Sequence, residues 1–262
     1  MKMRNLFYTF VIFGQVVFMP GLATAEEPNS GPPKGEVSPK ADMPGQKEKE
    51  KAMTVKLQWF GHASFKITDG NTVIYIDPWK LKEAGHGATL VLVSHSHYDH
   101  FSAPDIEKVS NPNTRLVAAG DVIAAEGKGD VLKPGQTLDI SGVRVTGVPA
   151  YNPAKKFHPK ANNWLGFVIE TGGKRIYYSG DSDETPEMDA LKNIDLALLP
   201  VGGTYTMDAG EAANATKQFK PKRAIPYHWG DIVGSKTDAD AFAKKAGCPV
   251  IVLKPGESTP VE

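Results

Sequence analysis

The alternation of apolar and polar residues changes its period several times along residues 53–262, and it predicts a series of short strands and helices. A continuous apolar run, Thr89-Leu-Val-Leu-Val-Ser94, is typical of a strand that is buried on both faces. Turn residues at Ser141-Gly142 and at Thr171-Gly172-Gly173 predict two hairpins. Strands are predicted over residues 55–60, 63–68, 72–76, 89–94, 115–119, 136–140, 143–148, 165–170, 174–179, 194–200, 223–226 and 250–253.

Helices are predicted where apolar and alanine residues recur at helical spacing. Ser102 as a side-chain cap and Pro104 near the first position predict a helix that begins at Ala103. Because two blocks of strands are each followed by helices, the pattern predicts two sheets face to face with helices outside. The two blocks differ too much in sequence to indicate a repeat. Further helices are predicted over residues 121–125, 186–192, 207–219 and 237–246.

Residues 1–25 have the pattern of a secretory signal peptide. Lys2 and Arg4 give a positive start, and Ala23-Thr24-Ala25 supplies the small residues that a signal peptidase needs. A membrane anchor is the alternative, but the apolar run of roughly 13 residues is shorter than the ~20 that span a bilayer. We therefore expect cleavage after Ala25 and an exported protein with no transmembrane segment after cleavage.

Residues 26–52 are rich in proline and in charges of both signs. Such a sequence buries too little apolar area to offset the entropy of ordering it, so we expect a disordered linker. Docking to a cell wall or a membrane surface is the functional alternative for this segment. Residues 53–262 are then expected to form a single domain.

The overall composition narrows the classes of function. The 262 residues carry 30 basic and 30 acidic side chains, and this balance argues against a protein whose main task is to bind nucleic acid. Cys248 is the only cysteine of the sequence, which excludes an internal disulfide and a zinc cluster held by several thiolates. Any metal in this protein must therefore be held by nitrogen and oxygen atoms.

The densest group of chemically active side chains follows the apolar run of residues 89–94. Imidazole and carboxylate groups are ligands suited to zinc, and four of them lie here within six residues: His95, His97, Asp99 and His100. Alternate residues of an extended stretch point the same way, so the first two histidines can bind one ion. The other two residues project where the chain turns and can reach a second ion. A polar loop that caps the next helix is the structural alternative.

Two further strand ends carry residues of the same kind. Asp181 follows Gly180 at the end of a predicted strand and is placed to bridge two metals, and His228 follows another strand. Alone, each has a structural alternative, a turn aspartate for Asp181 and a packed side chain for His228. Together they favour one shared site, because loops at one edge of a sheet converge.

These motifs resemble a known family. HxHxDH after an apolar strand, followed by SGDSD and PYHWG, resembles the metallo-β-lactamase fold superfamily. The opening WFGHASF and the later IDPW are similar to the branch of ascorbate-6-phosphate lactonases and N-acyl phosphatidylethanolamine phospholipase D. The resemblance implies an α/β (α+β) fold, a four-layer αββα sandwich of two mixed sheets with helices on the outer faces. It also implies a site for one or two metals at the sheet edges, and hydrolysis of an ester-like or phosphodiester bond by metal-bound hydroxide.

The resemblance also implies a role for each candidate ligand: His95 and His97 for the first metal, Asp181 as the bridge, and Asp99, His100 and His228 for the second metal. One position departs from the family pattern, because Asn152 stands where a third histidine for the first metal is usual. We hypothesise that nearby His158 completes this set of ligands or contacts the substrate.

The candidate catalytic residues are Asp99, His62 and His158. Asp99 can orient the nucleophile as well as bind metal, whereas His62 either faces the cleft or is a hydrogen-bonded structural histidine. Asp77 is expected to accept a hydrogen bond from a metal ligand rather than to bind metal. His86, between glycines, is expected in a solvated loop. Four aromatic residues can line the cleft, although a core position is favoured for each: Tyr151, Trp164, Tyr205 and Trp229.

The sequence thus predicts an exported metal-dependent hydrolase, periplasmic or secreted, that acts on an ester, lactone or phosphodiester of a small molecule or lipid. Zinc is the expected cofactor, as one or two ions, with manganese or iron as alternatives. A non-catalytic metal- or ligand-binding module of the same fold is the alternative from a different class. A nuclease or a β-lactam hydrolase is less favoured, and the β-rich start disfavours a (β/α)8 barrel. The sequence leaves the substrate and the oligomeric state open.

Overall fold

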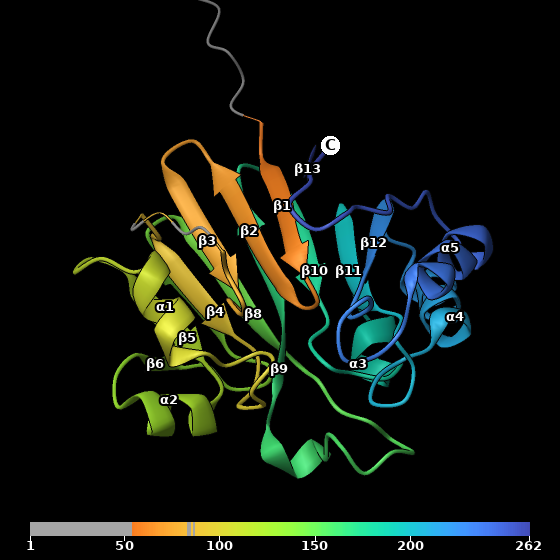
Figure 1. Cartoon of the computed structure of the whole chain (residues 1–262), viewed down its shortest axis with the longest axis horizontal. Coiled ribbons are helices and arrows are strands. Elements are labelled where there is room, and N and C mark those ends of the chain that lie inside the picture. The colour runs from red at the N-terminus through yellow and green to blue at the C-terminus, as the bar shows by residue number, and fades with distance from the viewer. Residues whose placement is uncertain (1–53, 83–84, 86) are drawn as a thin grey trace, which may run out of the picture. The chain divides into compact units, whose positions relative to one another are not determined.

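The computed structural model describes residues 54–82, 85 and 87–262 of the chain. The signal peptide and the linker predicted over residues 1–25 and 26–52, and the loop position predicted for His86, lie outside the described residues. Two β-sheets with helices beside them make up the described part (Figure 1). Within the same residues, no helix combines the length and the apolar character needed to cross a membrane.

The first sheet has seven strands in the order β13-β1-β2-β3-β4-β5-β6. Strands β13, β1, β2 and β3 pair antiparallel with their neighbours, whereas β3, β4, β5 and β6 pair parallel, so the sheet is mixed. The strands span Lys56–Gly61 (β1), Ser64–Asp69 (β2), Thr72–Ile76 (β3), Leu90–Val93 (β4), Arg115–Ala118 (β5), Asp130–Val131 (β6) and Ser258–Pro260 (β13).

The second sheet has six strands in the order β12-β11-β10-β9-β8-β7. It is also mixed, because β7 to β10 pair antiparallel and β10 to β12 pair parallel. Apart from β13, each half of the chain therefore begins with antiparallel strands and ends with parallel ones. The strands span Thr137–Ile140 (β7), Val143–Pro149 (β8), Leu165–Thr171 (β9), Lys174–Tyr178 (β10), Leu196–Pro200 (β11) and Arg223–Tyr227 (β12).

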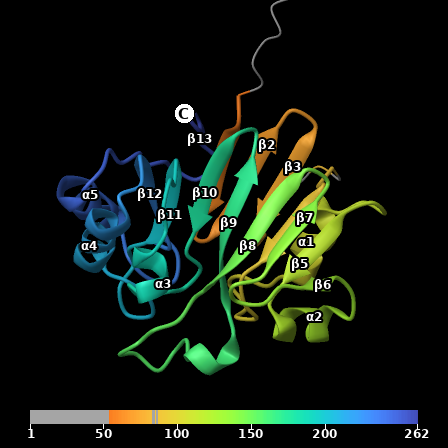
Figure 2. The same ribbon diagram turned by 180° about the vertical axis from the view of Figure 1, so that it is seen from behind.

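Helices cover the outer faces of both sheets (Figures 1 and 2). Helix α2 packs against β5 and β6 of the first sheet, while α4 packs against β11 and α5 against β12 of the second. This arrangement confirms the αββα sandwich that the sequence predicts. The helices span Ala103–Val109 (α1), Gly120–Glu126 (α2), Pro186–Asp189 (α3), Ala209–Phe219 (α4) and Lys236–Lys245 (α5), and a 3-10 turn spans Lys160–Asn162 (η1).

Aromatic side chains join the two sheets in the core. Phe65 on β2 packs edge to face against Tyr178 of β10 and Tyr227 of β12, with ring centroids 6.1 and 5.6 Å apart. All three side chains are fully buried, and each such aromatic pair is worth about 0.5–1.5 kcal/mol beyond its apolar burial. The two sheets therefore share one apolar core, which ends where the polar loops at the strand ends begin.

The predicted helix starts agree with the observed caps. Ser102 caps α1, since its side chain accepts a hydrogen bond from the Asp105 backbone N–H, and Pro104 lies in the first turn. Helix α4 begins at Ala209 rather than at 207, because the Asp208 carboxylate accepts hydrogen bonds from the first-turn N–H groups. The helix predicted over residues 186–192 is shorter and ends at Asp189.

The strand predicted over residues 250–253 is wrong. Only an isolated bridge forms there, in which Ala224 of β12 donates to the Pro249 carbonyl and accepts from the Ile251 N–H. The next residue of β12 that faces this segment is Pro226, which has no N–H with which to continue the parallel ladder. The last strand is instead β13, which pairs antiparallel with β1 at the edge of the first sheet and which the sequence pattern missed, as it missed β6.

The candidate site residues lie at loops that follow the strand ends. Gly180 lies two residues after the end of β10 and precedes Asp181, and it has a left-handed φ of +59°. A β-carbon at Gly180 would meet the Leu165 carbonyl oxygen of β9. The position of Asp181 thus depends on the absence of a side chain at the residue before it.

Replacing Gly180 with alanine is expected to lower the free energy of unfolding by about 2 kcal/mol or more, from left-handed strain and the contact with Leu165 together. Gly173→Ala is the matched control, because Gly173 has a φ of +71° but nothing within 4 Å of an added β-carbon. Urea denaturation measures both variants. Equal destabilisation of the two would contradict a steric role for Gly180.

Candidate metal centre

The loop after β4 supplies the first candidate ligands. All four residues of β4 are buried between parallel neighbours β3 and β5, so the loop leaves the sheet from a rigid strand end. The His97 carbonyl accepts hydrogen bonds from the N–H groups of His100 and Phe101 and turns the chain. This turn separates the direction of His95 and His97 from that of Asp99 and His100, as the motif predicts.

His95, His97 and His158 form a first group of side chains whose ligand atoms lie within 4.8 Å of one another. His95 Nε2 and His97 Nδ1 are 3.1 Å apart. The ring of Trp164 packs against all three imidazoles, with centroid distances of 4.7 to 5.5 Å. The structure thus places His158 with the two histidines of the first predicted metal.

Asp99, His100 and His228 form a second group, which also includes His62. Asp99 Oδ2 lies 3.8 Å from His100 Nε2 and 3.9 Å from His228 Nε2. It lies closer to His62, whose Nε2 is 2.9 Å away. Three of these four residues are the predicted ligands of the second metal.

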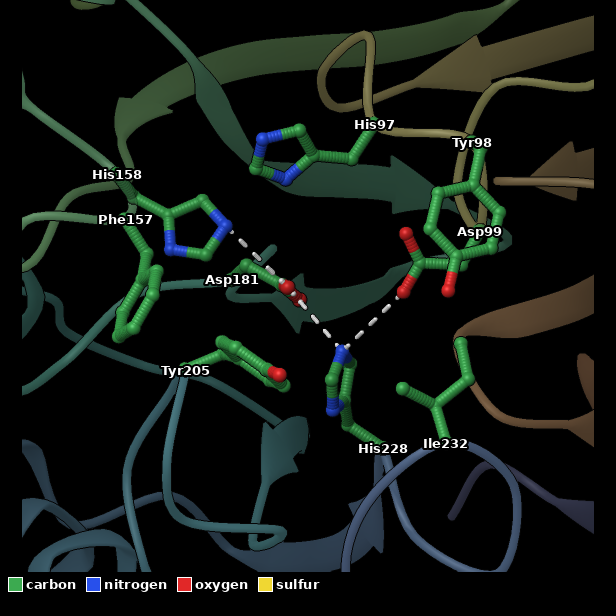
Figure 3. Close-up of a pocket in the computed structure, with 9 residues that line it drawn as sticks. All are labelled: His97, Tyr98, Asp99, Phe157, His158, Asp181, Tyr205, His228 and Ile232. Atoms are coloured by element: carbon green, nitrogen blue, oxygen red, sulfur yellow. Dashed lines mark ion pairs between the residues drawn. The ribbon is translucent and has the colours of Figure 1, made fainter.

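Asp181 lies between the two groups (Figure 3). Its Oδ2 is 3.4 Å from His158 Nε2 of the first group and 3.1 Å from His228 Nε2 of the second. Its Oδ1 is 3.2 Å from His100 Nε2. One carboxylate therefore faces histidines of both groups.

The centre contains several buried polar atoms with no hydrogen-bond partner among the described residues. They include His100 Nε2, His158 Nε2, His228 Nε2 and Asp181 Oδ1, which approach one another closely but not in hydrogen-bond geometry. An unpaired buried polar atom is costly, and several that converge on one place indicate a missing positive partner. Nitrogen and oxygen donors arranged in this way fit divalent zinc, and the described residues therefore contain a His/Asp cluster able to bind metal.

Asp77 forms hydrogen bonds with the cluster but does not line the cavity. Its Oδ2 accepts hydrogen bonds from His100 Nδ1 at 2.7 Å, from the Ser94 hydroxyl at 2.5 Å and from the Tyr178 hydroxyl at 2.6 Å. The bond to Nδ1 leaves Nε2 of His100 free to face Asp181. The predicted hydrogen bond from a candidate ligand to Asp77 is present, although Asp77, His95 and His100 also form a group close enough to hold a metal.

The side-chain oxygen of Asn152 faces His158 and not Asp181. Its Oδ1 accepts hydrogen bonds from the backbone N–H of His158 at 3.1 Å and from His158 Nδ1 at 2.7 Å. Because Nδ1 is engaged, Nε2 of His158 points toward Asp181. Where the family pattern has a histidine, this chain therefore has an asparagine, Asn152, that orients another histidine, His158.

Burial and charge set the protonation of the cluster. Burial lowers the pKa of His95 well below its usual range and that of His158 to about 4, so both imidazoles are neutral at neutral pH. Burial also opposes charge on His100, but the carboxylates of Asp181 and Asp77 raise its pKa well above the usual value. Burial opposes ionisation of Asp181 as well, and the neighbouring His100 and His228 nevertheless hold its pKa well below the usual range. Metal binding at this position therefore competes with a proton.

His62 lies behind Asp99, fully buried and outside the cavity lining. Its φ is +47°, and its carbonyl accepts hydrogen bonds from Trp59 Nε1 and from the backbone N–H of His228. Its ring lies 4.1 Å from the ring of His228. The side chain is in place to orient Asp99, and its catalytic role stays a prediction.

The predicted cleft aromatics have different surroundings. Trp229 packs on Trp59 in the core, and the buried ring of Tyr151 directs its hydroxyl to Glu187. Tyr205, by contrast, is 36% exposed and lines the cavity, so the core position favoured by the sequence is wrong for this residue.

Three cavity residues were assigned no role from the sequence: Tyr98, Phe157 and Ile232. Two of them are adjacent to candidate ligands, since Tyr98 lies inside the HxHxDH motif and Phe157 precedes His158. Ile232 lies in a turn between Gly230 and Gly234, which no chemical motif marks.

Comparisons with known proteins agree with this geometry. The family model of the beta-lactamase superfamily domain matches residues 56–228. A UPF0173 metal-dependent hydrolase of Thermococcus onnurineus is 33% identical over 221 residues, which cover 78% of this chain and 98% of the relative. A relative of the same description from Thermoplasma acidophilum is 34% identical over 224 residues, with 79% and 98% covered. Igni18, a metallo hydrolase from Ignicoccus hospitalis, is a solved structure with 25% identity and a TM-score of 0.66, covering 80% of this chain and 99% of its own.

The fold and the histidine- and aspartate-rich centre define a metal-dependent hydrolase of the metallo-β-lactamase fold. Within this class, the chain belongs to the beta-lactamase superfamily and to its UPF0173 metal-dependent hydrolases. The predicted superfamily and enzyme class are confirmed. The narrower resemblance to ascorbate-6-phosphate lactonases and N-acyl phosphatidylethanolamine phospholipase D stays a prediction.

Asn152→Ala is expected to weaken the affinity for one of the bound metal equivalents about tenfold or more, because His158 loses the acceptor that fixes its orientation. Competition with a chromophoric chelator measures this affinity. Asn162→Ala, an exposed asparagine of the same connection, serves as the control. Equal affinity in the two variants would show that His158 does not depend on Asn152.

Proposed function

We propose that this protein is an exported hydrolase with a two-metal centre. His95, His97 and His158 hold the first ion, Asp181 bridges, and Asp99, His100 and His228 hold the second. The observation that carries this proposal is the convergence of unpartnered buried atoms from both groups on the Asp181 carboxylate. Zinc is the proposed metal because imidazole and carboxylate donors suit it, with manganese or iron as alternatives.

When bound, the ions lower the pKa of a coordinated water toward neutrality and polarise the bond under attack. The chain's own residues determine the geometry around this chemistry. Asp99 is held by His62 on the buried side and presents its carboxylate to the cavity, where it can orient the attacking water. Asp77 and Asn152 fix the rings of His100 and His158, so the donors keep their directions without a ligand present.

The proposed substrate is an ester, lactone or phosphodiester of a small molecule or lipid. A net charge of zero supports a partner other than nucleic acid. Export to the periplasm or to the medium is proposed from the signal-like pattern of residues 1–25. The alternative of a non-catalytic binding module relied on an incomplete first set of ligands, and the position of His158 supports a complete set.

Elemental analysis of the purified protein is expected to find more than one equivalent of metal, and chelation is expected to abolish hydrolysis and lower Tm. His95→Ala is expected to lose about one equivalent and to reduce kcat/KM about 100-fold or more, since a catalytic metal supplies several kcal/mol. Asp139→Asn, an exposed residue of β7, is the control.

The substrates for this test are bis-p-nitrophenyl phosphate, simple lactones, nitrocefin and phospholipids. Bound metal with no turnover of any of them would favour the binding module. A wild-type protein that binds no metal and has the same activity as His95→Ala would contradict the two-metal centre.

His62→Ala is expected to lower kcat about 10- to 100-fold with little change in KM, because Asp99 loses the imidazole that orients it. His62→Gln, which keeps a hydrogen-bond donor, is expected to recover part of this loss. Steady-state kinetics together with metal analysis of each variant distinguishes a loss of Asp99 orientation from a loss of metal. A change confined to Tm, with kcat unaltered, would assign His62 a structural role only.

A further inference from the structure

The mouth of the metal centre is apolar. A cavity of about 240 Å³ opens above the cluster, and five of its nine lining residues belong to the proposed ligands. The others are Tyr98, Phe157, Tyr205 and Ile232, whose side chains surround the ligand groups in Figure 3. They come from four different loops, which follow β4, β8, β11 and β12. Independent segments of the chain thus place apolar groups around one opening.

These four side chains are unusual in their exposure. Among the described residues, five large hydrophobic side chains are exposed, and four of them are at this mouth, with Tyr98 68% and Ile232 46% exposed. The fifth, Val131, is in β6. Scattered apolar residues on a surface need no explanation, but a group that surrounds a cavity marks a ligand-binding site.

Ile232 gives independent support. Its φ is +66°, a left-handed conformation that is strongly disfavoured for a β-branched residue. The turn that contains it has glycine at Gly230 and Gly234, both with positive φ. Strain of this kind, at an exposed apolar side chain in a cavity wall, indicates a functional requirement for that side chain.

The cavity lining contains no cationic side chain, since neither Lys nor Arg is among its nine described residues. Two lysines close to the mouth, Lys155 and Lys80, are already paired. Lys155 Nζ contacts Asp183 at 2.7 Å and the Thr206 carbonyl at 2.8 Å, and Lys80 Nζ contacts Asp231 at 2.7 Å. Lys156, next to Phe157, is exposed but does not line the cavity. Apart from the proposed metal ions, the lining thus offers no cation for a phosphate group, and its apolar side chains favour an uncharged acyl group.

We infer that the substrate is an uncharged ester or lactone with a short apolar acyl chain, which Phe157, Tyr205 and Ile232 contact. This inference rests on the proposed hydrolase function and selects among its substrate classes. A cavity of about 240 Å³ is smaller than the roughly 300–1,000 Å³ that is typical of ligand sites, which favours a short acyl chain over the two chains of a phospholipid. In the reaction, the water oxygen bonds to the carbonyl carbon and the acyl C–O bond breaks. The leaving oxygen takes one proton of the water and the other is released to solvent, so the products are a carboxylate and an alcohol.

The test uses the metal-loaded protein with p-nitrophenyl acetate, propionate and butyrate, which share one leaving group. We expect kcat/KM to rise about threefold to fourfold for each added methylene. Phe157→Ala and Tyr205→Ala should flatten this series, whereas Val131→Ala, which changes an exposed apolar residue away from the cavity, should leave it unaltered. In calorimetry, N-methylbutanamide, an inert and uncharged analogue, should bind more weakly to Phe157→Ala and Tyr205→Ala than to the wild-type protein, without any turnover.

Ile232→Gly separates a binding role from a structural one. Glycine relieves the left-handed strain, so Tm should stay the same or rise, while the dependence on acyl length is lost. A flat ester series in the wild-type protein would overturn the inference. So would a higher kcat/KM for bis-p-nitrophenyl phosphate than for every ester, or a loss of ester hydrolysis in Lys156→Ala. If bis-p-nitrophenyl phosphate is the preferred substrate, the proposed metal-dependent hydrolysis would still hold. If turnover is insensitive to chelation, the proposed function itself would be contradicted.

Discussion

One buried carboxylate connects the two sheets to the metal centre. Asp77 accepts hydrogen bonds from the backbone and hydroxyl of Ser94, from the hydroxyl of Tyr178 and from Nδ1 of His100. Ser94 and His100 follow β4 of the first sheet, whereas Tyr178 ends β10 of the second. A carboxylate without exposure is tolerated only when donors surround it, so the sheets must meet at this point for Asp77 to be stable. The direction of the His100 ring then follows from the packing of the whole sandwich.

Backbone strain gathers at the same place. His62, Asp77 and His228 all have positive φ, of +47°, +43° and +60°. The backbone N–H of His228 donates to the carbonyl of His62, so two strained residues from distant parts of the chain hold each other. Residues in this conformation persist only where their surroundings fix them, and such residues concentrate at functional sites. The candidate ligands are therefore oriented by backbone and buried side chains.

The chemistry of the centre could be predicted from sequence more readily than its geometry. The HxHxDH motif places its groups within one loop, so local spacing was sufficient to predict their division between two groups of side chains. The position of His158 depends on the hydrogen bonds that it donates to the Asn152 side-chain oxygen, which no local pattern encodes. The strand predicted over residues 250–253 failed for a similar reason, because the missing N–H of Pro226 belongs to the neighbouring strand. The apolar mouth was missed because tyrosine, phenylalanine and isoleucine are expected in a core unless the fold exposes them.

The two halves of the chain repeat one order of antiparallel and then parallel strands, and each half supplies part of the centre. His95 to His100 come from the first half, whereas His158, Asp181 and His228 come from the second. Neither half alone contains the complete set of proposed ligands. The complete set of proposed ligands is therefore assembled only when the two halves have docked through the apolar core and the Asp77 contacts. Metal ions held by these proposed ligands would act as a reversible cross-link between segments that are far apart in the chain.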